Sequence, residues 1–221
     1  MDVLWFQLSA RPGDPEDVAL RLVPGRIVAP FPRRTHWQVG YVIPKGADAQ
    51  VRAAGLEALR RSVAELVPEL ADRVDELRDW EQVKLLTVRS DRLRVWWREG
   101  YLAIGDAAHA MSPIGGVGIN LAIQDAVVAA NRLWRPLRER SGVSVSQLAA
   151  IQRRRELTVR LIQRLQAVIQ DQLLGPALGS GEAFRVPIWA RLLLATPGLR
   201  DLPPRLIAYG LDRPRVARAL R

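Results

Sequence analysis

Alternation of apolar and polar positions predicts β-strands in the first part of the chain. Residues 2–8 (DVLWFQL) and 25–31 (GRIVAPF) are short runs rich in β-forming side chains. A third run, residues 34–44, alternates strictly: Thr35, Trp37, Val39, Tyr41 and Ile43 fall on one face, and His36, Gln38 and Gly40 on the other. The short intervals between the runs predict an antiparallel sheet.

Helical spacing replaces alternation further along the chain. Apolar residues three and four positions apart predict helices over residues 51–67, 119–137 and 146–174. The apolar stripe of the last helix is expected to be Leu157, Leu161, Leu165, Val168 and Ile169. Residues 83–88, 93–97 and 101–104 predict further strands, residues 175–181 a linker, and residues 186–197 and 204–211 closing helices.

Composition narrows the class of protein. The 221 residues include 48% hydrophobic residues, which fits a folded globular chain, and no apolar run approaches the ~18 residues of a membrane span. The absence of cysteine excludes disulfides and thiolate chemistry, and no secretory signal is visible, so a cytoplasmic protein is expected. The net charge is +10, with Lys45 and Lys84 the only lysines, but the arginines are dispersed and no nucleic-acid-binding motif is present. We therefore expect neither a nucleic-acid partner nor a membrane span.

The stretch from Tyr101 to Leu133 carries the candidate chemistry. A short apolar run leads into Gly105 and Asp106, a glycine-containing loop follows, and a helical pattern begins near Gly118. Exposed N–H groups at a helix start attract electron-rich groups, whereas a carboxylate accepts hydrogen bonds from hydroxyls. This combination suits a ligand with a polyol at one end and a polarisable plane at the other, such as a flavin. On residue types alone, the simpler interpretation is a tight strand–loop–helix turn in which Asp106 caps backbone amides.

The sequence GDAAHAMSPIGGVGINLAIQDA resembles the second flavin-contacting motif of the FAD-dependent aromatic hydroxylases, the group A flavoprotein monooxygenases related to p-hydroxybenzoate hydroxylase. The matching positions are Gly105, Asp106, Ala107, Ala108, His109, Pro113, Gly115, Gly118, Asn120, Asp125 and Ala126. The resemblance covers roughly Met1 to Leu137, and the remainder matches only as helical C-terminal material.

The resemblance implies a set of cofactor-binding residues. Asp106 would hold the ribityl chain, backbone groups of Gly118, Ile119 and Asn120 would face the isoalloxazine pyrimidine, and Pro113 would lie beside the ring. The full implied set is Gly105, Asp106, Pro113, Gly115, Gly116, Gly118, Ile119 and Asn120. It includes no metal ligand and no catalytic side chain, and His109 would be structural.

Other notable residues have plainer expected roles. Trp37, Gln38 and Tyr41 are candidates for substrate contact, with ordinary sheet packing as the alternative. The Trp96–Trp97 pair is expected in a core, and residues 153–155, three consecutive arginines, on a solvated helix face.

The implied activity is NAD(P)H- and O₂-dependent hydroxylation of an aromatic or polyketide-like small molecule through a flavin C4a-hydroperoxide. Two alternatives stay open: a flavin-dependent reductase or halogenase on the same scaffold, and a non-catalytic truncated remnant or interaction module. A halogenase would be expected to carry a separate signature rich in lysine and tryptophan, which is not found.

The family's usual opening, a strand, a Gly-x-Gly-x-x-Gly turn and a helix, has no match here. The expected fold is therefore an α+β fragment of an α/β flavoprotein that lacks the N-terminal Rossmann βαβ unit. Residues 1–93 would be the antiparallel substrate-domain sheet with its helices, residues 94–140 the second half of the FAD-binding domain, and residues 141–221 a helical tail. A separate N-terminal half is then an expected partner, and activity of this chain alone is in question.

Overall fold

The computed structural model describes residues 1–17, 20–179, 195–196, 198, 200–201, 205–206 and 209–218. It divides into unit 1, Met1–Val88 with Gln170–Pro187, and unit 2, Arg89–Ile169 with Ile188–Arg221. The predicted closing helices and the end of the predicted linker lie largely outside the described residues.

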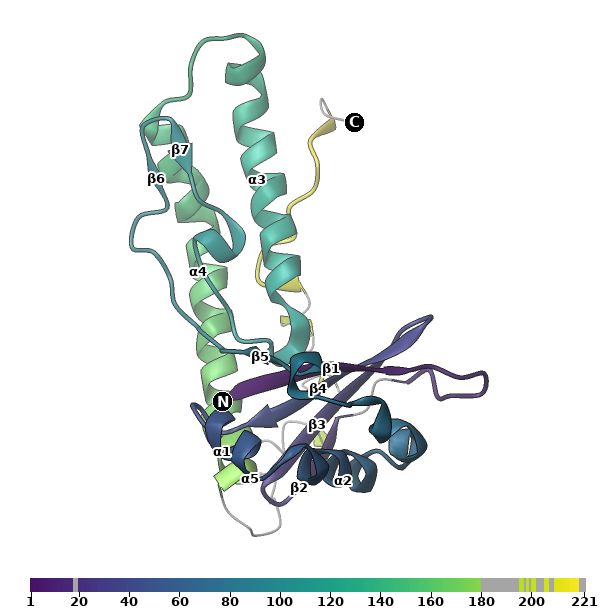
Figure 1. The fold of residues 1–221 in the computed structure, drawn as a ribbon. Coiled ribbons are helices and arrows are strands. Elements are labelled where there is room, and N and C mark those ends of the chain that lie inside the picture. The colour runs from purple at the N-terminus through teal and green to yellow at the C-terminus, as the bar shows by residue number, and fades with distance from the viewer. Residues whose placement is uncertain are drawn as a thin grey trace. The chain divides into compact units, whose positions relative to one another are not determined.

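Unit 1 is built on a five-stranded antiparallel sheet (Figure 1). In spatial order the strands are β2 (Arg21–Val23), β3 (Arg26–Pro32), β4 (His36–Ile43), β1 (Asp2–Ser9) and β5 (Lys84–Leu86). The central pair is in register over eight residues, from Asp2 opposite Ile43 to Ser9 opposite His36. The strands predicted at residues 2–8, 25–31, 34–44 and 83–88 and their antiparallel pairing are confirmed, and β2 is an additional short strand. Of the strand predicted at residues 93–97, only Trp97 is in a strand.

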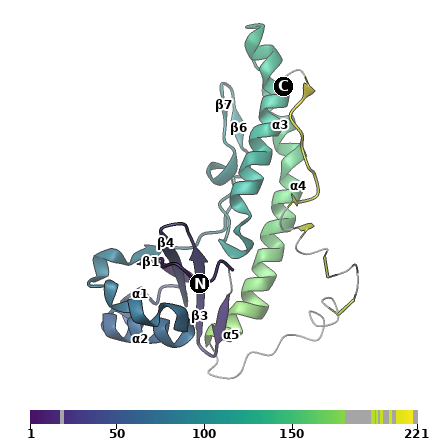
Figure 2. The same ribbon diagram turned by 90° about the vertical axis from the view of Figure 1, so that its right-hand side faces the viewer.

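Helices cover one face of this sheet (Figure 2). The predicted helix over 51–67 forms as two pieces, α1 (Asp48–Ala53) and α2 (Leu56–Leu66), with Gly55 between them at a φ of 90°. Two 3₁₀ segments follow, Pro68–Glu76 and Trp80–Gln82. Buried apolar residues of the sheet and of α2, such as Phe6, Val39 and Val63, form the main core.

The opposite sheet face has a smaller apolar cluster. Val3, Ile27 and Val42 pack there with Ala177 and Leu178 of α5 (Gly175–Gly179), which follows a π-helical segment, Gln170–Leu174. The prediction of a linker at residues 175–179 is therefore wrong. Burial of Ala177 against the sheet stabilises a helical turn that Gly175 and Gly179 do not favour locally.

Unit 2 combines a β-hairpin with two long helices, the second of which contacts the hairpin. The strands β6 (Trp97–Arg98) and β7 (Tyr101–Leu102) pair antiparallel, and α3 (Gly118–Arg138) packs against α4 (Val145–Ile169). Trp96 is fully buried in the cluster between the hairpin and α4, so its expected place in a core is confirmed. Both predicted helices form close to their expected bounds.

The buried face of α4 differs from the predicted stripe. Leu157 is 66% exposed, and the buried set is Leu148, Ile151, Gln152, Arg155, Thr158, Val159, Ile162 and Gln166. Arg155 is fully buried, so the expectation of a solvated arginine triplet is wrong at that position, although Arg153 and Arg154 are exposed. Polar side chains occupy this face because they hydrogen-bond groups in the adjacent loops and in α3.

The C-terminal segment 209–218 runs beside α3 (Figure 1). The amide of Asn131 donates to the carbonyl of Arg215 at 2.7 Å and accepts from the N–H of Ala217 at 2.8 Å. By length and composition alone, Ile114–Arg138 is the one stretch of the described residues able to cross a membrane. This is weak evidence, because the core helix of a water-soluble protein meets the same criterion and α3 carries the buried charge of Asp125.

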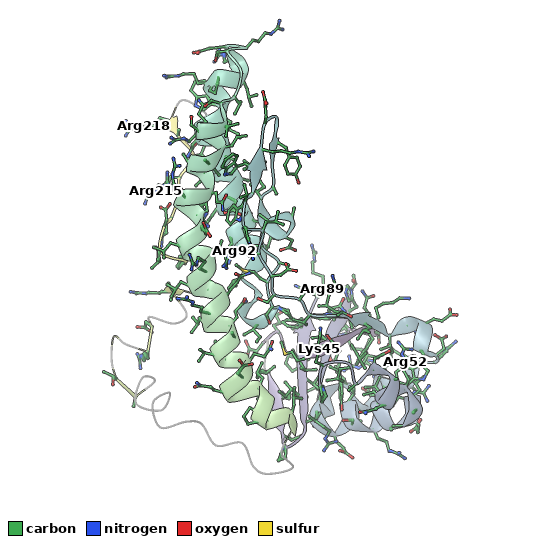
Figure 3. The ribbon with its side chains drawn as sticks, turned by 90° about the vertical axis from the view of Figure 1, so that its left-hand side faces the viewer. Lys45, Arg52, Arg89, Arg92, Arg215 and Arg218 are labelled. Atoms are coloured by element: carbon green, nitrogen blue, oxygen red, sulfur yellow. The ribbon has the colours of Figure 1, made fainter. Side chains whose placement is uncertain are left out.

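Basic side chains are present on both units (Figure 3). Lys45 and Arg52 belong to unit 1, and Arg92 and Arg215 to unit 2. Several engage in local contacts: Lys45 pairs with Asp2 at 2.7 Å, and Arg92 donates to Gln163 at 2.7 Å. In these cases the positive charge has a defined structural partner.

Candidate functional site

The turn after β7 is fixed by a buried carboxylate of α3. Gly105 has a φ of 57°, a region that glycine adopts readily, and its N–H donates to Oδ2 of Asp125 at 3.1 Å. Space also requires glycine here, because a Cβ at this position would lie 2.9 Å from the Cβ of Ala122. The turn therefore packs directly on α3, which sets the position of Asp106.

Asp125 joins three segments of unit 2. Besides Gly105, it contacts Nε2 of His109 at 2.6 Å and accepts from Nε of Arg155 at 2.7 Å, and all three side chains are almost fully buried. Burial alone would raise the pKa of Asp125, but the hydrogen bonds and charges of His109 and Arg155 hold it below its ordinary value. A buried carboxylate with donors on several sides is an anchor for the turn rather than a ligand-facing group.

Asp106 has the opposite surroundings. Its side chain is exposed, and its Oδ1 lies 3.8 Å from the point that a Cβ on Gly118 would occupy. Gly118 begins α3, whose N-cap residue, Val117, makes no side-chain cap hydrogen bond. The carboxylate and the positive end of the helix are therefore neighbours on an accessible surface.

The segment between Asp106 and Gly118 includes a glycine-rich turn. Ile114–Gly116 is a 3₁₀ turn in which Gly115 and Gly116 have φ values of 77° and 61°. Pro113, Gly115 and Gly116 are exposed, and a Cβ on Gly116 would meet nothing within 4 Å. Ile119 and Asn120 are also exposed at the start of α3. The structure thus brings the predicted cofactor-binding residues, with Gly105 beneath them, into one region of unit 2.

His109 lies beneath this surface. It is 1% exposed, and its ring stacks at a tilt on Trp96 with 5.0 Å between ring centroids. The bond to Asp125 and this stacking are the contacts of a packed histidine.

The three candidate substrate residues fall on different faces of the unit 1 sheet. Trp37 is 2% exposed on the helix-covered face and donates to Asp14 at 2.7 Å. Tyr41 packs on the same side, with its hydroxyl 2.9 Å from Oγ of Ser62. Gln38 is on the other face and only partly buried. Their contact with a substrate stays a prediction, and the geometry favours Gln38 over the other two.

Gln38 belongs to a surface that we call the open face, formed by Trp5, Gln7, Phe31, Gln38 and Gly40. It lies on the same side of the sheet as the α5 cluster, against which Trp5 packs. The amide of Gln7 donates to that of Gln38 at 3.3 Å. The rings of Trp5 and Phe31 have centroids 5.8 Å apart, and a Cβ on Gly40 would lie 3.3 Å from Trp5. Two aromatic rings and two primary amides are thus presented together on one sheet face.

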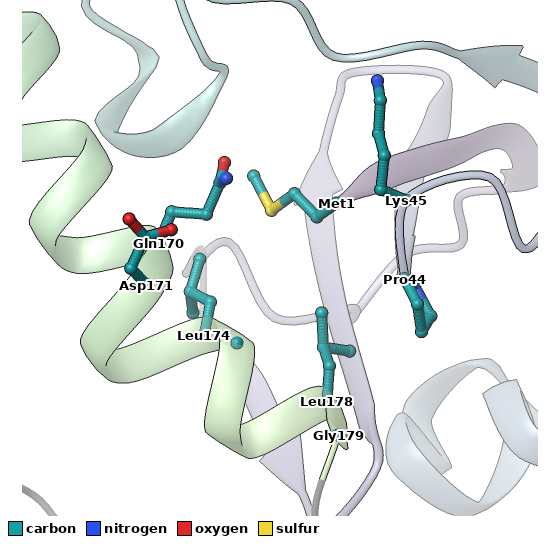
Figure 4. A pocket seen from close by; sticks show the side chains of 9 residues that line it. Met1, Pro44, Lys45, Gln170, Asp171, Leu174, Leu178 and Gly179 are labelled. Atoms are coloured by element: carbon teal, nitrogen blue, oxygen red, sulfur yellow. The ribbon is translucent and has the colours of Figure 1, made fainter.

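A hollow of about 270 Å³ lies elsewhere in unit 1 (Figure 4). Its lining mixes apolar side chains such as Leu174 and Leu178 with the charged Lys45 and Asp171. Among the described residues, no group of three or more His, Asp or Glu side chains is arranged to hold a metal ion.

Comparison with known proteins identifies the family of this arrangement. A family model described as FAD binding domain matches residues 1–164. The chain belongs to this FAD-binding family. The 6-methylpretetramide 4-monooxygenase of Streptomyces rimosus is 36% identical over 215 residues, covering 95% of this chain and 49% of that protein. The FAD-dependent monooxygenase atmM of Aspergillus flavus is 26% identical over 141 residues, covering 62% of this chain and 29% of that protein.

Solved structures of flavoproteins share the fold. PqsL of Pseudomonas aeruginosa, a probable FAD-dependent monooxygenase, superimposes with a TM-score of 0.62 at 23% identity, over 77% of this chain and 48% of that chain. The flavin-dependent brominase Bmp2 gives a TM-score of 0.65 at 16% identity, over 93% and 49%. The resemblance noted in the sequence is therefore confirmed, and the chain spans about half the length of the Streptomyces relative.

The residues present fit one end of FAD. The exposed carboxylate of Asp106 suits ribityl hydroxyls, and the positive end of α3 suits the electron-rich edge of an isoalloxazine ring. The open space over Gly116 leaves room for a flat group against the main chain. For the pyrophosphate and adenosine, the sequence offers no Gly-x-Gly-x-x-Gly turn.

Sequence reasoning missed the pair that anchors the site, Asp125 and Arg155. A signal was available in the helical phase of each residue. Asp125 stands four residues after Leu121, and Arg155 four residues after Ile151, so each falls on the buried side of its helix. Two opposite charges in buried phase on adjacent helices indicate an ion pair.

Proposed function

We propose that this chain forms the flavin-ring and substrate-binding part of an FAD-dependent monooxygenase that hydroxylates an aromatic or polyketide-like small molecule. NAD(P)H would be the reductant and O₂ the oxidant, which makes the cytoplasm the proposed compartment. The observation that carries the proposal is the exposed carboxylate of Asp106 beside Gly118, at the start of α3. When bound, FAD would supply the redox chemistry, and the residues of this chain would bind, orient and shield the reactants.

Each cofactor contact follows from chemical type. Asp106 would accept hydrogen bonds from the ribityl hydroxyls, and backbone groups of Gly118, Ile119 and Asn120 would meet the pyrimidine edge of the ring. Pro113, Gly115 and Gly116 would lie beside the ring, where a side chain larger than hydrogen on the glycines would intrude. The dipole of α3 would favour negative charge on that edge. No side chain of this set needs to act as a nucleophile or base.

The open face is the proposed substrate surface. Trp5 and Phe31 would contact a flat ring system, and Gln7 and Gln38 would bind its hydroxyl, keto or amide groups. The names of similar proteins favour a small organic substrate: one relative is named for 6-methylpretetramide, and PqsL has been solved with 2-aminobenzoylacetate. For this chain, the identity of the substrate is part of the proposal.

The proposed division of labour follows the sequence. Residues 1–93 would be the substrate domain, residues 94–140 the second half of the FAD-binding domain, and residues 141–221 a helical tail. A dinucleotide-binding βαβ unit outside these 221 residues would hold the pyrophosphate and adenosine of FAD. That unit, whether on the same polypeptide or separate, is the expected partner of this site.

A binding experiment tests the flavin assignment. FAD and riboflavin are titrated into the wild-type chain, the Asp106→Ala variant and the control variant Glu99→Ala, and flavin fluorescence is followed. Glu99 is also an exposed acid of unit 2, at the β6–β7 turn, so its removal makes the same change in charge away from the site. We expect Asp106→Ala to weaken both ligands by about tenfold, because one charge-assisted hydrogen bond contributes on the order of 1.5 kcal/mol or more.

The comparison of ligands adds a second criterion. Because the proposed contacts of this chain involve only the ring and ribityl chain, riboflavin and FAD should bind it with similar affinity. Equal affinity of the wild-type and Asp106→Ala chains for both ligands would remove the assigned role. Absence of flavin binding by the wild-type chain, even after addition of a dinucleotide-binding unit, would contradict the proposed function as a whole.

A further inference from the structure

Three glutamines of α4 hydrogen-bond backbone carbonyls of the segment that leads to the candidate flavin site. Gln152 donates to the carbonyl of Arg94 at 2.9 Å. Gln163 donates to the carbonyls of Asp91 and Ala110 at 2.8 and 3.0 Å. The third, Gln166, reaches the glycine-rich turn itself.

Gln166 holds both sides of Pro113. Its Nε2 donates to the carbonyl of Ser112 and to the carbonyl of Ile114, each at 2.8 Å. Pro113 has no N–H, so the turn has one fewer backbone donor with which to stabilise itself. Gln166 supplies donors from outside the turn, and its side chain is 2% exposed.

The orientation of this amide is fixed by chemistry. A flipped amide would place Oε1 against two carbonyl oxygens, which are acceptors only. In the orientation present, Oε1 is buried and has no hydrogen-bond partner among the described residues. An unpaired buried oxygen is unfavourable, so the two bonds made by Nε2 outweigh it. Gln166 therefore takes the orientation that satisfies the two carbonyls of the turn and leaves its own Oε1 unpaired.

We propose that Gln166 is a positioning residue of the flavin site, which rests on the proposed function. Its two bonds set the direction of the carbonyls on either side of Pro113. They thereby set the entry of the chain into Gly115, Gly116 and the exposed start of α3. No contact between Gln166 and the flavin is required, because it acts through the backbone of the turn.

The test compares two isosteric variants on the same helix, Gln166→Met and Gln163→Met. Methionine keeps the length of the side chain and removes its donors and acceptor. Gln163→Met removes two donated bonds and the bond accepted from Arg92, at least as many as Gln166→Met removes. If the lost bonds only loosen the structure, the two variants should therefore lose flavin binding alike. If Gln166 positions the turn, the loss should be confined to Gln166→Met.

The measurements are the affinity for riboflavin and FAD, the visible absorption spectrum of the bound flavin and its reduction potential. We expect Gln166→Met to weaken flavin binding about tenfold, with a shift in the spectrum and the potential, and Gln163→Met to stay within twofold of wild type. Equal losses in both variants, or unchanged flavin properties in Gln166→Met, would overturn the proposal. In either case, flavin binding by the wild-type chain would leave the proposed function intact.

A wild-type measurement covers the case in which Gln166→Met does not fold. Hydrogen exchange is followed by mass spectrometry with and without riboflavin. Riboflavin should slow exchange in peptides that contain residues 112–118 and the part of α4 around Gln166, with little change around Asp91. Slower exchange at residues 112–118 without any change around Gln166 would contradict coupling between the two.

Discussion

Replacement of Gly105 by alanine tests how the turn is seated on α3. The backbone of Gly105 has a φ of 57°, and an added Cβ would lie 2.9 Å from the Cβ of Ala122 and 3.6 Å from its Cα. The left-handed conformation costs an alanine about 1–2 kcal/mol. The overlap with Ala122 adds about 1–3 kcal/mol, because the turn and the helix must separate to relieve it. Gly105→Ala should therefore destabilise unit 2 by about 2–5 kcal/mol.

Gly116→Ala is the matched control. Gly116 has a φ of 61°, close to that of Gly105, but a Cβ there would meet nothing within 4 Å. Its cost should be the conformational part alone, about 1–2 kcal/mol. The difference between the two variants isolates the contact with Ala122.

Hydrogen exchange resolved by peptide is the suitable assay, because two compact units need not unfold together. Protection of α3 and α4 amides gives the opening free energy of unit 2. A double-mutant cycle with Ala122→Gly adds a specific criterion: this change costs about 1 kcal/mol in helix propensity by itself but removes the overlap. We expect the double variant to be more stable than the sum of the single changes predicts, by about 1–2 kcal/mol.

Two results would refute this reasoning. The first is an equal loss of protection in Gly105→Ala and Gly116→Ala, which would leave no role for the contact. The second is additivity of Gly105→Ala and Ala122→Gly, which would show that the turn does not rest on that part of α3.

Three further predictions concern the ion pairs and the sheet. Hydrogen bonds from Arg73 hold the pKa of Asp14 well below its ordinary value of 3.8, so this pair should stabilise unit 1 above about pH 4 and lose that effect as the pH falls further. Urea unfolding against pH should show this acid limb, and Asp14→Asn should flatten it; an unchanged limb would contradict the assignment. Arg155→Met leaves the buried charge of Asp125 without its guanidinium partner and should cost about 3–5 kcal/mol, measured by exchange of α3 amides, with unaltered protection as the contrary result. Tyr41→Phe removes one hydrogen bond beneath α2 and should lower the free energy of urea unfolding by about 0.5–1.5 kcal/mol, with substrate affinity unchanged. A large loss of substrate affinity would instead assign Tyr41 to the substrate.

Alternation and helical spacing correctly predicted the strands and helices that have one apolar side. The strands β1, β3 and β4 and the helices α2 and α3 bury apolar residues at regular intervals, so the pattern and the structure agree. The strand alternation even placed Trp37 and Gln38 on opposite faces. It could not tell which face the helices cover, because that depends on contacts between distant parts of the chain.

The helix α4 shows where the pattern fails. Its buried side includes Gln152, Arg155 and Gln166, and leucines such as Leu157 lie outside. A rule based on hydrophobicity alone assigns the two glutamines and the arginine to solvent, because it does not count their hydrogen bonds with loops elsewhere in the sequence. The candidate site divides similarly: its exposed residues follow from a recognisable motif, and the buried groups that support them follow from the fold.

The ion pair between Asp125 and Arg155 has a consequence for the order of events during synthesis. The motif around Gly105 and the first part of α3 leave the ribosome before Arg155, which is 30 residues further on than Asp125. At typical elongation rates this delay is on the order of a few seconds. During that time the nascent chain contains the motif, but Asp125 does not yet have Arg155 as its partner. A polypeptide ending before α4 would therefore carry the signature of the family without the ion pair that anchors the turn at Gly105, and the proposed cofactor binding belongs after α4 has emerged.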